Sequence, residues 1–316
     1  MKGVLRRFGQ LAVVLFLVTL FTASLISLLP GDVTVTIIPF GSDEQRAQLA
    51  EELGVDDPFF VQYKNWVGDF VQGDLGSFYR RSNTESVAER VVDAAPVSLL
   101  LMLYAQVLAL VIAIPVGVIS AYRAGSRFDK SANASAFALL AIPSFVLALV
   151  LAYVFAVELG WFPPQGYASP SEGLGEHIRF MVLPSVSLAV GQIAVYMRLL
   201  RSDMVATLQE DFILMAKSKG ITPQRVLWRH ALRPSSITLL TVAGLNVGTL
   251  IGGALIIEII FGLDGMGLLL FQAIQQQQIV AIQSLVAIIT IGYVMVNVLV
   301  DVLYAVLDPR IGHARS

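Results

Sequence analysis

Cysteine is absent from the 316 residues of this chain, which excludes a disulfide framework and thiolate chemistry. The three histidines, His177, His230 and His313, are far apart in the sequence and belong to no HExxH motif, so we expect no metal centre. The dipeptide Gly-Lys does not occur, and therefore the chain lacks the loop that cradles nucleotide phosphates. Because no G-x-S-x-G elbow is present either, the sequence predicts a protein that is not an enzyme and binds no cofactor of its own.

Charged residues are scarce as well. They make up 14% of the chain, while hydrophobic residues make up 56%; an average soluble domain is about a quarter charged. The charges are missing from long runs, and a membrane-spanning helix needs about 20 largely apolar residues. These runs lack the two-residue alternation of membrane strands, so they favour helices. The sequence therefore predicts an all-α integral membrane protein with six transmembrane helices, at residues 8–29, 97–122, 133–157, 181–197, 236–258 and 279–300.

The distribution of Lys and Arg predicts the orientation. Most of the 21 basic residues fall in segments 1–7, 123–130, 198–233 and 301–316, which lie on one side of the predicted spans. Cytoplasmic loops carry an excess of Lys and Arg, so we expect both termini in the cytoplasm of a multi-pass cell-membrane protein. The first apolar run could instead belong to a signal peptide, but it exceeds the usual length of about 7–15 residues, which favours an uncleaved span.

Residues 31–95 are too long for a simple loop and should carry structure of their own. Ser42 and Gln45 form a capping-box pattern, and Gly54 is placed to end the helix that follows. The next helix has an aromatic stripe at helical spacing, which consists of Phe59, Tyr63, Trp66 and Phe70. Two interpretations stay open, a cap packed on the spans and a docking surface for an external partner. The predicted division is an N-terminal transmembrane helix (1–30), an external helical segment (31–95) and a transmembrane core (96–316).

Acidic residues close to the spans are few and lie near span ends, at Glu258, Asp264 and Asp301. A proton-coupled carrier needs titratable groups near the membrane midplane, so this scarcity argues against one. For Asp301 a structural role is favoured over translocation. Pro143 and Pro184 fall inside or at the edges of spans, where proline kinks a helix.

The most basic of the predicted cytoplasmic loops contains the pattern of two short helices, at about residues 207–233. Thr207 and Glu210 form a capping box that opens the first helix, and Gly220 supplies the left-handed residue that ends it. The apolar face of this helix, with i, i+3, i+4 spacing, consists of Phe212, Met215 and Ala216.

The second short helix begins with Thr222 as N-cap and Pro223 in its first turn. It carries a basic stripe of Arg225, Arg229 and Arg233. Isolated helices of about ten residues are marginal in water, so both helices must pack on something. The membrane bundle and a partner protein are both candidates, since basic loops also lie close to anionic lipid headgroups.

This helix pair resembles the EAA loop in the membrane subunits of ABC importers. The family pattern Glu-Ala-Ala-x3-Gly falls here on Leu214, Met215, Ala216 and Gly220, so the second Ala and the Gly agree. The stretch 211–233 is closer to the variant found in peptide and nickel permeases. Other stretches similar to the B-type subunit of that subfamily are 28–32, 61–63, 73–76, 142–145, 160–163, 258–261 and 308–310. The chain departs from the family at 263–267, where Pro-Gly-Leu-Gly is usual, and at the four glutamines 275–278.

The resemblance implies the type I ABC importer permease fold and a translocation path for peptides or a similar small solute. It implies two ATP-binding subunits that hold ATP and Mg, a second homologous permease subunit, usually a different one, and an external substrate-binding protein. Membrane lipid surrounds such a subunit, and nucleic acid is no partner. The implied ATPase-coupling residues are Asp211, Phe212, Met215, Ala216, Lys217, Lys219, Gly220, Arg225, Arg229 and His230. A possible external gate comprises Glu258, Phe261 and Asp264.

Two other functions fit the residues alone. A stand-alone secondary transporter or channel predicts activity without an ATPase, and the missing midplane charges count against it. A membrane-embedded scaffold predicts no solute flux. The substrate is not readable from the sequence, because relatives with this pattern carry peptides, nickel chelates, glutathione or oligosaccharides.

Overall fold

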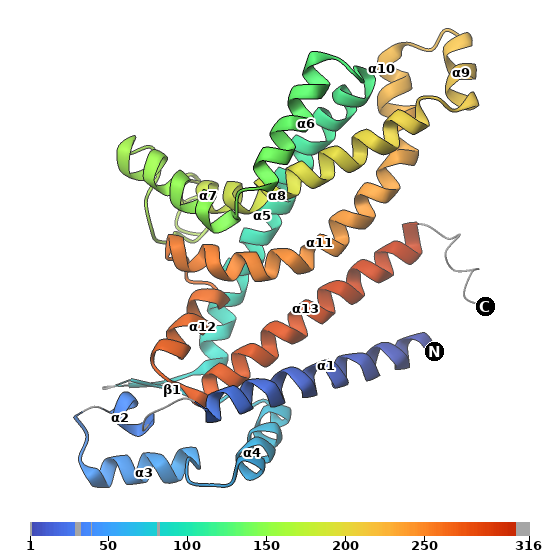
Figure 1. The fold of residues 1–316 in the computed structure, drawn as a ribbon. Helices are drawn as coiled ribbons and strands as arrows, with labels where there is room; N and C mark the ends of the chain where they lie inside the picture. Colours follow the sequence, from blue (N-terminus) through green and yellow to red (C-terminus); the bar gives the residue numbers. More distant parts are fainter. Residues whose placement is uncertain (1, 29–32, 39, 81–82, 308–316) are drawn as a thin grey trace. The chain divides into compact units, whose positions relative to one another are not determined.

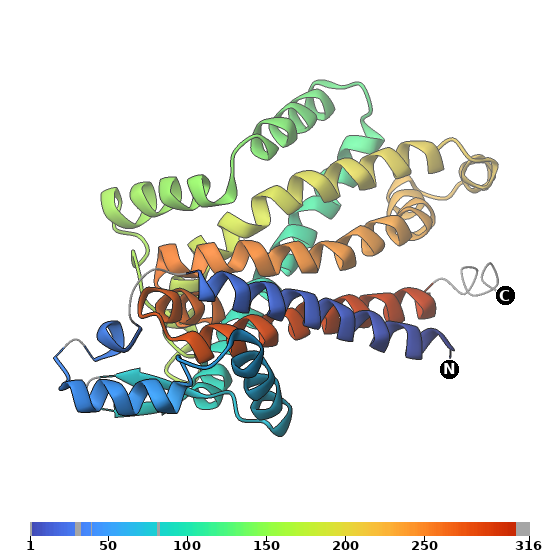
Figure 2. The same ribbon diagram turned by 60° about the horizontal axis from the view of Figure 1, so that its bottom comes forward.

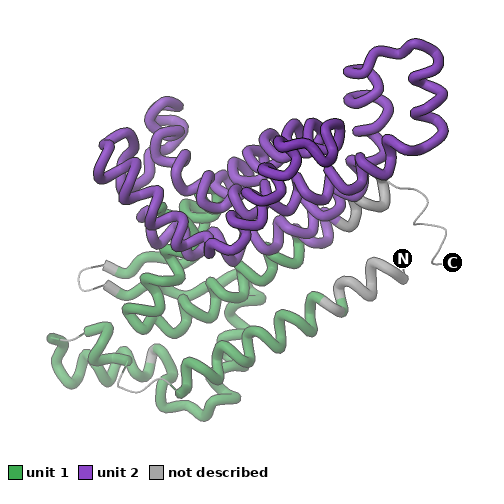
Figure 3. The backbone as a smooth tube through the Cα atoms, turned by 45° about the horizontal axis from the view of Figure 1, so that its top comes forward, with its two compact units in different colours: residues 1–98, 263–295 green, residues 99–262, 296–316 purple. Residues whose placement is uncertain are grey.

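The computed structural model describes residues 2–28, 33–38, 40–80 and 83–307. Most of this part of the chain is helical (Figure 1). The chain divides into two compact units (Figure 3). Unit 1 comprises residues 1–98 and 263–295, and unit 2 comprises residues 99–262 and 296–316.

Four helices among the described residues are long and apolar enough to cross a membrane. They are α5 (Val87–Tyr122), α8 (Leu174–Thr207), the continuous helix Pro223–Phe261, and the Ile279–Val300 part of α13 (Ile279–Leu307). A bent helix pair raises the number to five if it forms one span. The first predicted span falls on α1 (Lys2–Ser27), whose apolar part Leu11–Ser27 is shorter. The helical membrane architecture is confirmed, and the number of six spans stays a prediction.

Unit 1 contains α1 and, after it, three helices of the predicted external segment, α2 (Val33–Ile37), α3 (Asp43–Leu53) and α4 (Phe59–Gln72). The capping box of α3 is confirmed. The Ser42 hydroxyl accepts a hydrogen bond from the backbone nitrogen of Gln45 at 3.3 Å. In return, the Gln45 side-chain oxygen Oε1 accepts one from the backbone nitrogen of Ser42 at 3.0 Å. Gly54 ends α3 in the left-handed region, with φ 59°, as its position predicts.

The aromatic stripe of α4 packs inward within unit 1. Trp66 is buried, and its Nε1 donates to the Ser284 hydroxyl of α13 at 3.1 Å. The Tyr63 and Thr19 hydroxyls share a hydrogen bond of 2.9 Å, which ties α4 to α1. The interpretation of the stripe as packing is therefore confirmed. A docking role for the rest of the segment stays a prediction.

Unit 1 also contains two elements that the sequence did not predict. An antiparallel hairpin of β1 (Ser77–Arg80) and β2 (Asn83–Ser86) precedes α5. The Gln278 side chain extends the hairpin. Its Oε1 accepts a hydrogen bond from the Tyr79 backbone nitrogen at 3.1 Å, and its Nε2 donates to the Tyr79 carbonyl at 2.8 Å. The second element is α12 (Met266–Gln275), whose first amide donates to the Ser98 hydroxyl at 2.9 Å.

Unit 2 contains the break in the third predicted span. The span predicted at 133–157 is not one continuous helix, and the break falls at Pro143, where the sequence predicts a kink. Instead, α6 (Arg127–Leu140) and the helix made of α7 (Ser144–Leu151) and the π-helical turn η1 (Ala152–Glu158) meet at 98°. Pro143 causes the break because it has no N–H to donate and disfavours helical geometry in the residue before it. By contrast, α8 continues through Pro184.

Helices α8 and α11 (Leu232–Phe261) run side by side in unit 2 in both ribbon views (Figures 1 and 2). Helices α6 and α7 also pack on α8. The α6–α8 contact includes the Arg198 guanidinium, which lies 3.9 Å from the centre of the Phe137 ring. This packing fixes the end of α8, from which the candidate site begins.

Candidate coupling site

The predicted coupling segment starts at the end of α8. Thr207 is the last residue of α8 and does not cap the next helix. Its hydroxyl shares a hydrogen bond of 2.9 Å with the Ser235 hydroxyl of α11. The predicted capping box of Thr207 and Glu210 is therefore wrong. Buried residues such as Leu200 and Met204 hold α8 in the bundle almost to its end, and tertiary packing overrides the local signal.

The first short helix is α9 (Asp211–Ser218), which follows Glu210 as its N-cap. Its packed face differs from the predicted one. Ile213 and Ala216 are buried, with 0% and 6% exposure, whereas Phe212 and Met215 are 45% and 58% exposed. Ile213 and Ala216 are three residues apart, so helical spacing could have found this face. Phe212, Leu214 and Met215 are left as an exposed apolar surface on α9.

Gly220 ends α9 as predicted. Its φ is 74°, in the left-handed region that glycine adopts most readily. The Gly220 nitrogen donates to the Lys217 carbonyl at 2.9 Å, and the Ile221 nitrogen donates to the Ala216 carbonyl at 3.2 Å. This pair of bonds is the Schellman motif, which satisfies carbonyls that the helix leaves open at its end.

The second short helix is not a separate element. Thr222 is the N-cap of α10 (Pro223–Arg225) and Pro223 is its first residue, as predicted. However, α10 continues through the π-helical turn η2 (Val226–Ala231) directly into α11. The wide turn ends three residues before Pro234, whose ring in a regular α-helix would press on the carbonyl four residues earlier. Arg225, Arg229 and Arg233 therefore belong to the first turns of a membrane-spanning helix.

Most of the predicted coupling residues lie at the surface. Ala216 is buried and His230 is half-buried, and the other eight are exposed, namely Asp211, Phe212, Met215, Lys217, Lys219, Gly220, Arg225 and Arg229. Trp228 on η2, which the sequence argument did not single out, is 46% exposed. Its neighbours Val226 and Leu227 are buried and hold η2 in place. We name the four exposed apolar side chains, Phe212, Leu214, Met215 and Trp228, the coupling patch.

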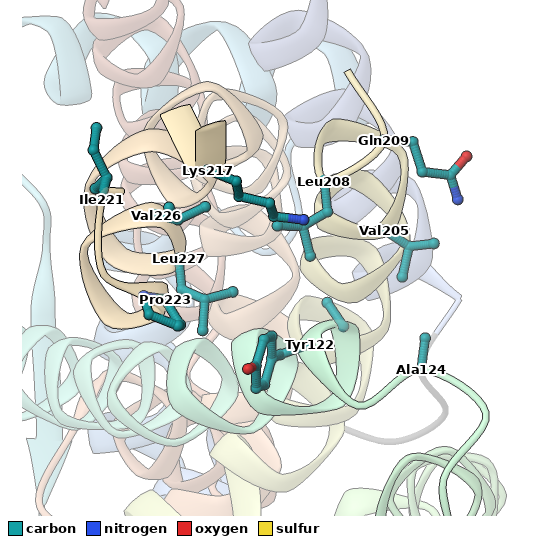
Figure 4. A pocket seen from close by; sticks show the side chains of 11 residues that line it. Tyr122, Ala124, Val205, Leu208, Gln209, Lys217, Ile221, Pro223, Val226 and Leu227 are labelled. Atoms are coloured by element: carbon teal, nitrogen blue, oxygen red, sulfur yellow. The ribbon is translucent and has the colours of Figure 1, made fainter. Parts of the chain in front are cut away.

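A cavity of about 410 Å³ lies behind this segment, between α9, η2 and the ends of α5 and α8 (Figure 4). Tyr122 and Ala124 border it from the α5 side, and Leu208 borders it after α8. The Lys217 side chain extends across it toward Leu208 (Figure 4). The space between α9 and the ends of the spans is therefore not filled by side chains on this side.

An ion pair that the sequence argument missed braces the same end of unit 2. Asp129 on α6 makes a bidentate pair with Arg201 on α8, in which Oδ1 accepts from Nε and Oδ2 accepts from Nη2 at 2.6 Å. Asp129 also accepts from the Gly125 nitrogen at 2.8 Å and from Asn133 Nδ2 at 2.9 Å. Bidentate charge-assisted bonds are geometrically specific, so the pair fixes the turn before α6 against α8. Two charges 72 residues apart gave no sequence signal.

The three predicted gate residues fall in different units. Glu258 and Phe261 are buried near the end of α11 in unit 2. The loop before α8 is tied to that end, because the Gly166 nitrogen donates to the Phe261 carbonyl at 2.9 Å and Gln165 Nε2 to the Ile260 carbonyl at 3.3 Å. Asp264 is exposed in unit 1, where it borders a cavity of about 270 Å³ together with Arg90 and Asp93.

Comparison with known proteins identifies the class of transport protein. Residues 113–313 match the family "Binding-protein-dependent transport system inner membrane component", and residues 1–102 match its N-terminal family. The chain belongs to this family. The permease is 36% identical to the oligopeptide transport system permease protein AppB of Bacillus subtilis, over 98% of each chain. It is 33% identical to the dipeptide transport system permease protein DppB of Alkalihalophilus pseudofirmus, over 97% of this chain and 98% of that one.

The family settles the general role. The chain is a membrane-spanning subunit of an ABC importer with the type I permease fold, and a multi-pass inner-membrane protein. A permease of this family works with ATPase and substrate-binding partners. The resemblance drawn from the sequence is thus confirmed. The family match counts against the alternative of a stand-alone transporter.

Proposed function

We propose that this permease forms the translocation path for peptides, or for small solutes of similar chemistry, together with a second homologous permease subunit. The names of the relatives support peptides as the solute class. An external substrate-binding protein delivers the solute, and two ATPase subunits that hold ATP and Mg²⁺ drive the cycle. Both termini lie in the cytoplasm, in agreement with the excess of Lys and Arg on that side.

The coupling patch is the surface that we expect to contact the ATPase. Four large apolar side chains are exposed on α9 and η2, next to exposed cations such as Lys219 and Arg225. Apolar anchors within a polar rim are typical of a protein–protein interface. Asp211, Lys217, Arg229 and His230 complete the proposed surface. When ATP closes the ATPase dimer, the surface moves as a body, and α8 and α11 carry the motion into the spans because the segment joins them directly.

The external gate and the division of the chain are part of the same proposal. Glu258 and Phe261 would control the end of the path opposite the coupling patch, with Asp264 in the following turn. Residues 31–95 would face the external compartment, beyond the N-terminal helix (1–30), and residues 96–316 would form the core in contact with membrane lipid. The tie from Gly166 to the Phe261 carbonyl supports a defined arrangement at that end.

A pull-down tests the proposal. The tagged chain is purified in mild detergent from its native membrane, and its partners are identified by mass spectrometry. Phe212→Asp should remove the ATPase, because an anchor residue of an interface contributes about 2 kcal/mol or more, equivalent to a roughly thirtyfold loss of affinity. Phe60→Asp is the control. It changes a phenylalanine of α4 that is 76% exposed and lies outside the coupling segment, so this variant should retain the ATPase.

Two results would contradict the proposal. Retention of the ATPase by the Phe212→Asp variant removes α9 from the interface. Purification of the unaltered chain alone, or as a homo-oligomer without ATPase, favours a stand-alone transporter.

A further inference from the structure

Three helices of unit 2 carry uncharged polar side chains near their middles. Gln106 lies near the middle of α5, Gln192 and Tyr196 near the middle of α8, and Asn246 and Thr249 near the middle of α11. All three helices are long enough to cross the membrane. A search for intramembrane charge passes over these residues, since none of them is ionised.

The inner part of this set is buried and joins the helices. Tyr196 is fully buried, and its hydroxyl donates to Gln106 Oε1 at 3.1 Å. Gln106 Nε2 donates to the Ala243 carbonyl of α11 at 3.3 Å. These bonds satisfy the buried polar groups in a medium that offers no water. The inner pair is therefore a structural support.

The outer part reaches the surface. Asn246 Nδ2 donates to Gln192 Oε1 at 2.9 Å, and Gln192 Nε2 donates to the Thr249 hydroxyl at 3.2 Å. Thr249 in turn donates to the Asn246 carbonyl at 2.7 Å. Gln192 and Asn246 are half-buried and Thr249 is exposed. We name Gln192, Asn246 and Thr249 the mid-helix polar face.

Open space adjoins this face. Gly252 lies one turn beyond Thr249 and is exposed, and a Cβ placed on it would meet no atom of the rest of the protein within 4 Å. Among the described residues of unit 2, Gly252 therefore leaves open space at its Cβ position, one turn from Thr249. The face presents amide and hydroxyl groups that are held in fixed orientations by one another.

Another surface of the same unit has the composition expected of a lipid-facing helix. Between residues 99 and 111 of α5 the exposed residues recur every four positions and are all apolar, namely Leu99, Leu103, Val107 and Val111. Hydrocarbon accepts such a stripe, but it penalises polar side chains near the bilayer centre, which usually face a bundle interior or a water-filled cavity. The mid-helix polar face is therefore not a lipid surface.

We propose that Gln192, Asn246 and Thr249 line the translocation path and hydrogen-bond the backbone amides of a passing peptide. This inference rests on the proposed function. Side-chain amides both donate and accept hydrogen bonds, as peptide groups do, and they carry no charge that would select for the sign of a peptide side chain. Because the three groups already bond to one another, they remain satisfied when the path is empty, which a face built only for contact with the second permease does not require.

The absence of cysteine from the chain allows a clean test by single-cysteine labelling. Thr249→Cys is compared with Val107→Cys, a position that is 49% exposed near the middle of α5 in the apolar stripe. Each variant is reconstituted with its partner subunits and treated with a charged methanethiosulfonate reagent, which does not enter hydrocarbon. Modification of this chain is followed by its mass, with and without trialanine, binding protein and ATP.

The proposal predicts that Thr249→Cys is modified at least about tenfold faster than Val107→Cys, because a thiolate forms in water and not in lipid. Trialanine under turnover conditions should slow the modification of Thr249→Cys. Equal, slow labelling of both variants overturns the proposal and assigns the face to contact with the second permease. Rapid labelling that trialanine leaves unchanged overturns the assignment to the peptide backbone.

Uptake separates this inference from the proposed function. If the Val107→Cys complex assembles but shows no ATP-dependent peptide uptake, the proposed function fails. If that complex transports peptides while Thr249→Cys stays unreactive, only the assignment of the mid-helix polar face fails.

Discussion

The coupling patch and the mid-helix polar face belong to the same unit and have opposite chemistry. The patch exposes phenylalanine, leucine, methionine and tryptophan at the end of the helices, where water is the expected solvent. The polar face exposes amide and hydroxyl groups near the middle of the helices, where lipid is the expected solvent. Each surface is unfavourable in the medium expected at its depth.

The apolar stripe of α5 shows the contrasting case, since Leu103 and Val107 match the lipid expected around them. A surface that matches its solvent needs no further explanation. A mismatched surface has a cost that a partner or a ligand removes. The two mismatched surfaces of unit 2 are therefore the ones for which we propose a working role, one toward another protein and one toward the solute.

Replacing Gly220 with valine should disrupt the function that we propose for the coupling patch. A β-branched residue in the left-handed region costs about 1–3 kcal/mol. A Cβ on Gly220 would meet no atom within 4 Å, so the cost falls on the backbone and not on packing. We expect the turn after α9 to change, and ATP hydrolysis to become uncoupled from uptake while membrane insertion is retained. ATPase rate and peptide uptake are measured on the same reconstituted complex.

Asparagine at Gly220 is the matched control, because it tolerates the left-handed conformation better than other non-glycine residues. Gly220→Asn should keep most of the uptake. Unchanged uptake in the Gly220→Val variant would falsify the assignment of α9 to coupling.

Replacing Gly252 with leucine should disrupt the function that we propose for the mid-helix polar face. The new side chain meets no atom of this chain at its Cβ, and leucine is a better helix former than glycine, so the fold should tolerate it. It would fill the space beside Thr249, and we expect peptide uptake close to background with ATP-binding partners still attached. Gly252→Ala adds only a methyl group and should transport nearly as well as the unaltered chain. Normal uptake by the leucine variant would place Gly252 outside the path.

The sequence predicted the elements that depend on local signals. Charge-free runs located the apolar helices, and the patterns at Ser42, Gly54 and Gly220 located helix ends correctly. The capping prediction failed because it depended on a contact between distant residues. Thr207 carries a capping signal, but its hydrogen bond to Ser235 of α11 was invisible in the sequence.

The candidate site was predictable to a similar extent. The segment and its glycine turn were identified, but not which face of α9 packs inward, because Phe212, Ile213 and Met215 are all apolar and only the fold decides between them. The continuity of α10 with α11 was not predicted either, because the second short helix and the span at 236–258 were expected as separate elements, whereas the π-helical turn η2 joins them. The mid-helix polar face was missed because only ionised residues were sought in the spans.

The smallest expected effect is that of Lys217→Gln. This substitution tests whether charge contributes to ATPase binding in addition to the apolar anchors of the coupling patch. Lys217 is exposed on α9, and an exposed ion pair contributes about 0.2–1 kcal/mol. Lys217→Gln should therefore weaken ATPase binding by about fivefold at most, and the difference should vanish at high salt because screening acts on surface charges. Binding of the ATPase to the purified permease is measured at low and high salt. Lys64→Gln, at an exposed lysine of α4, should bind as the unaltered chain does. A large loss for Lys217→Gln that persists at high salt would instead show that this side chain is buried at the interface, and the patch would then extend over the cavity that Lys217 borders.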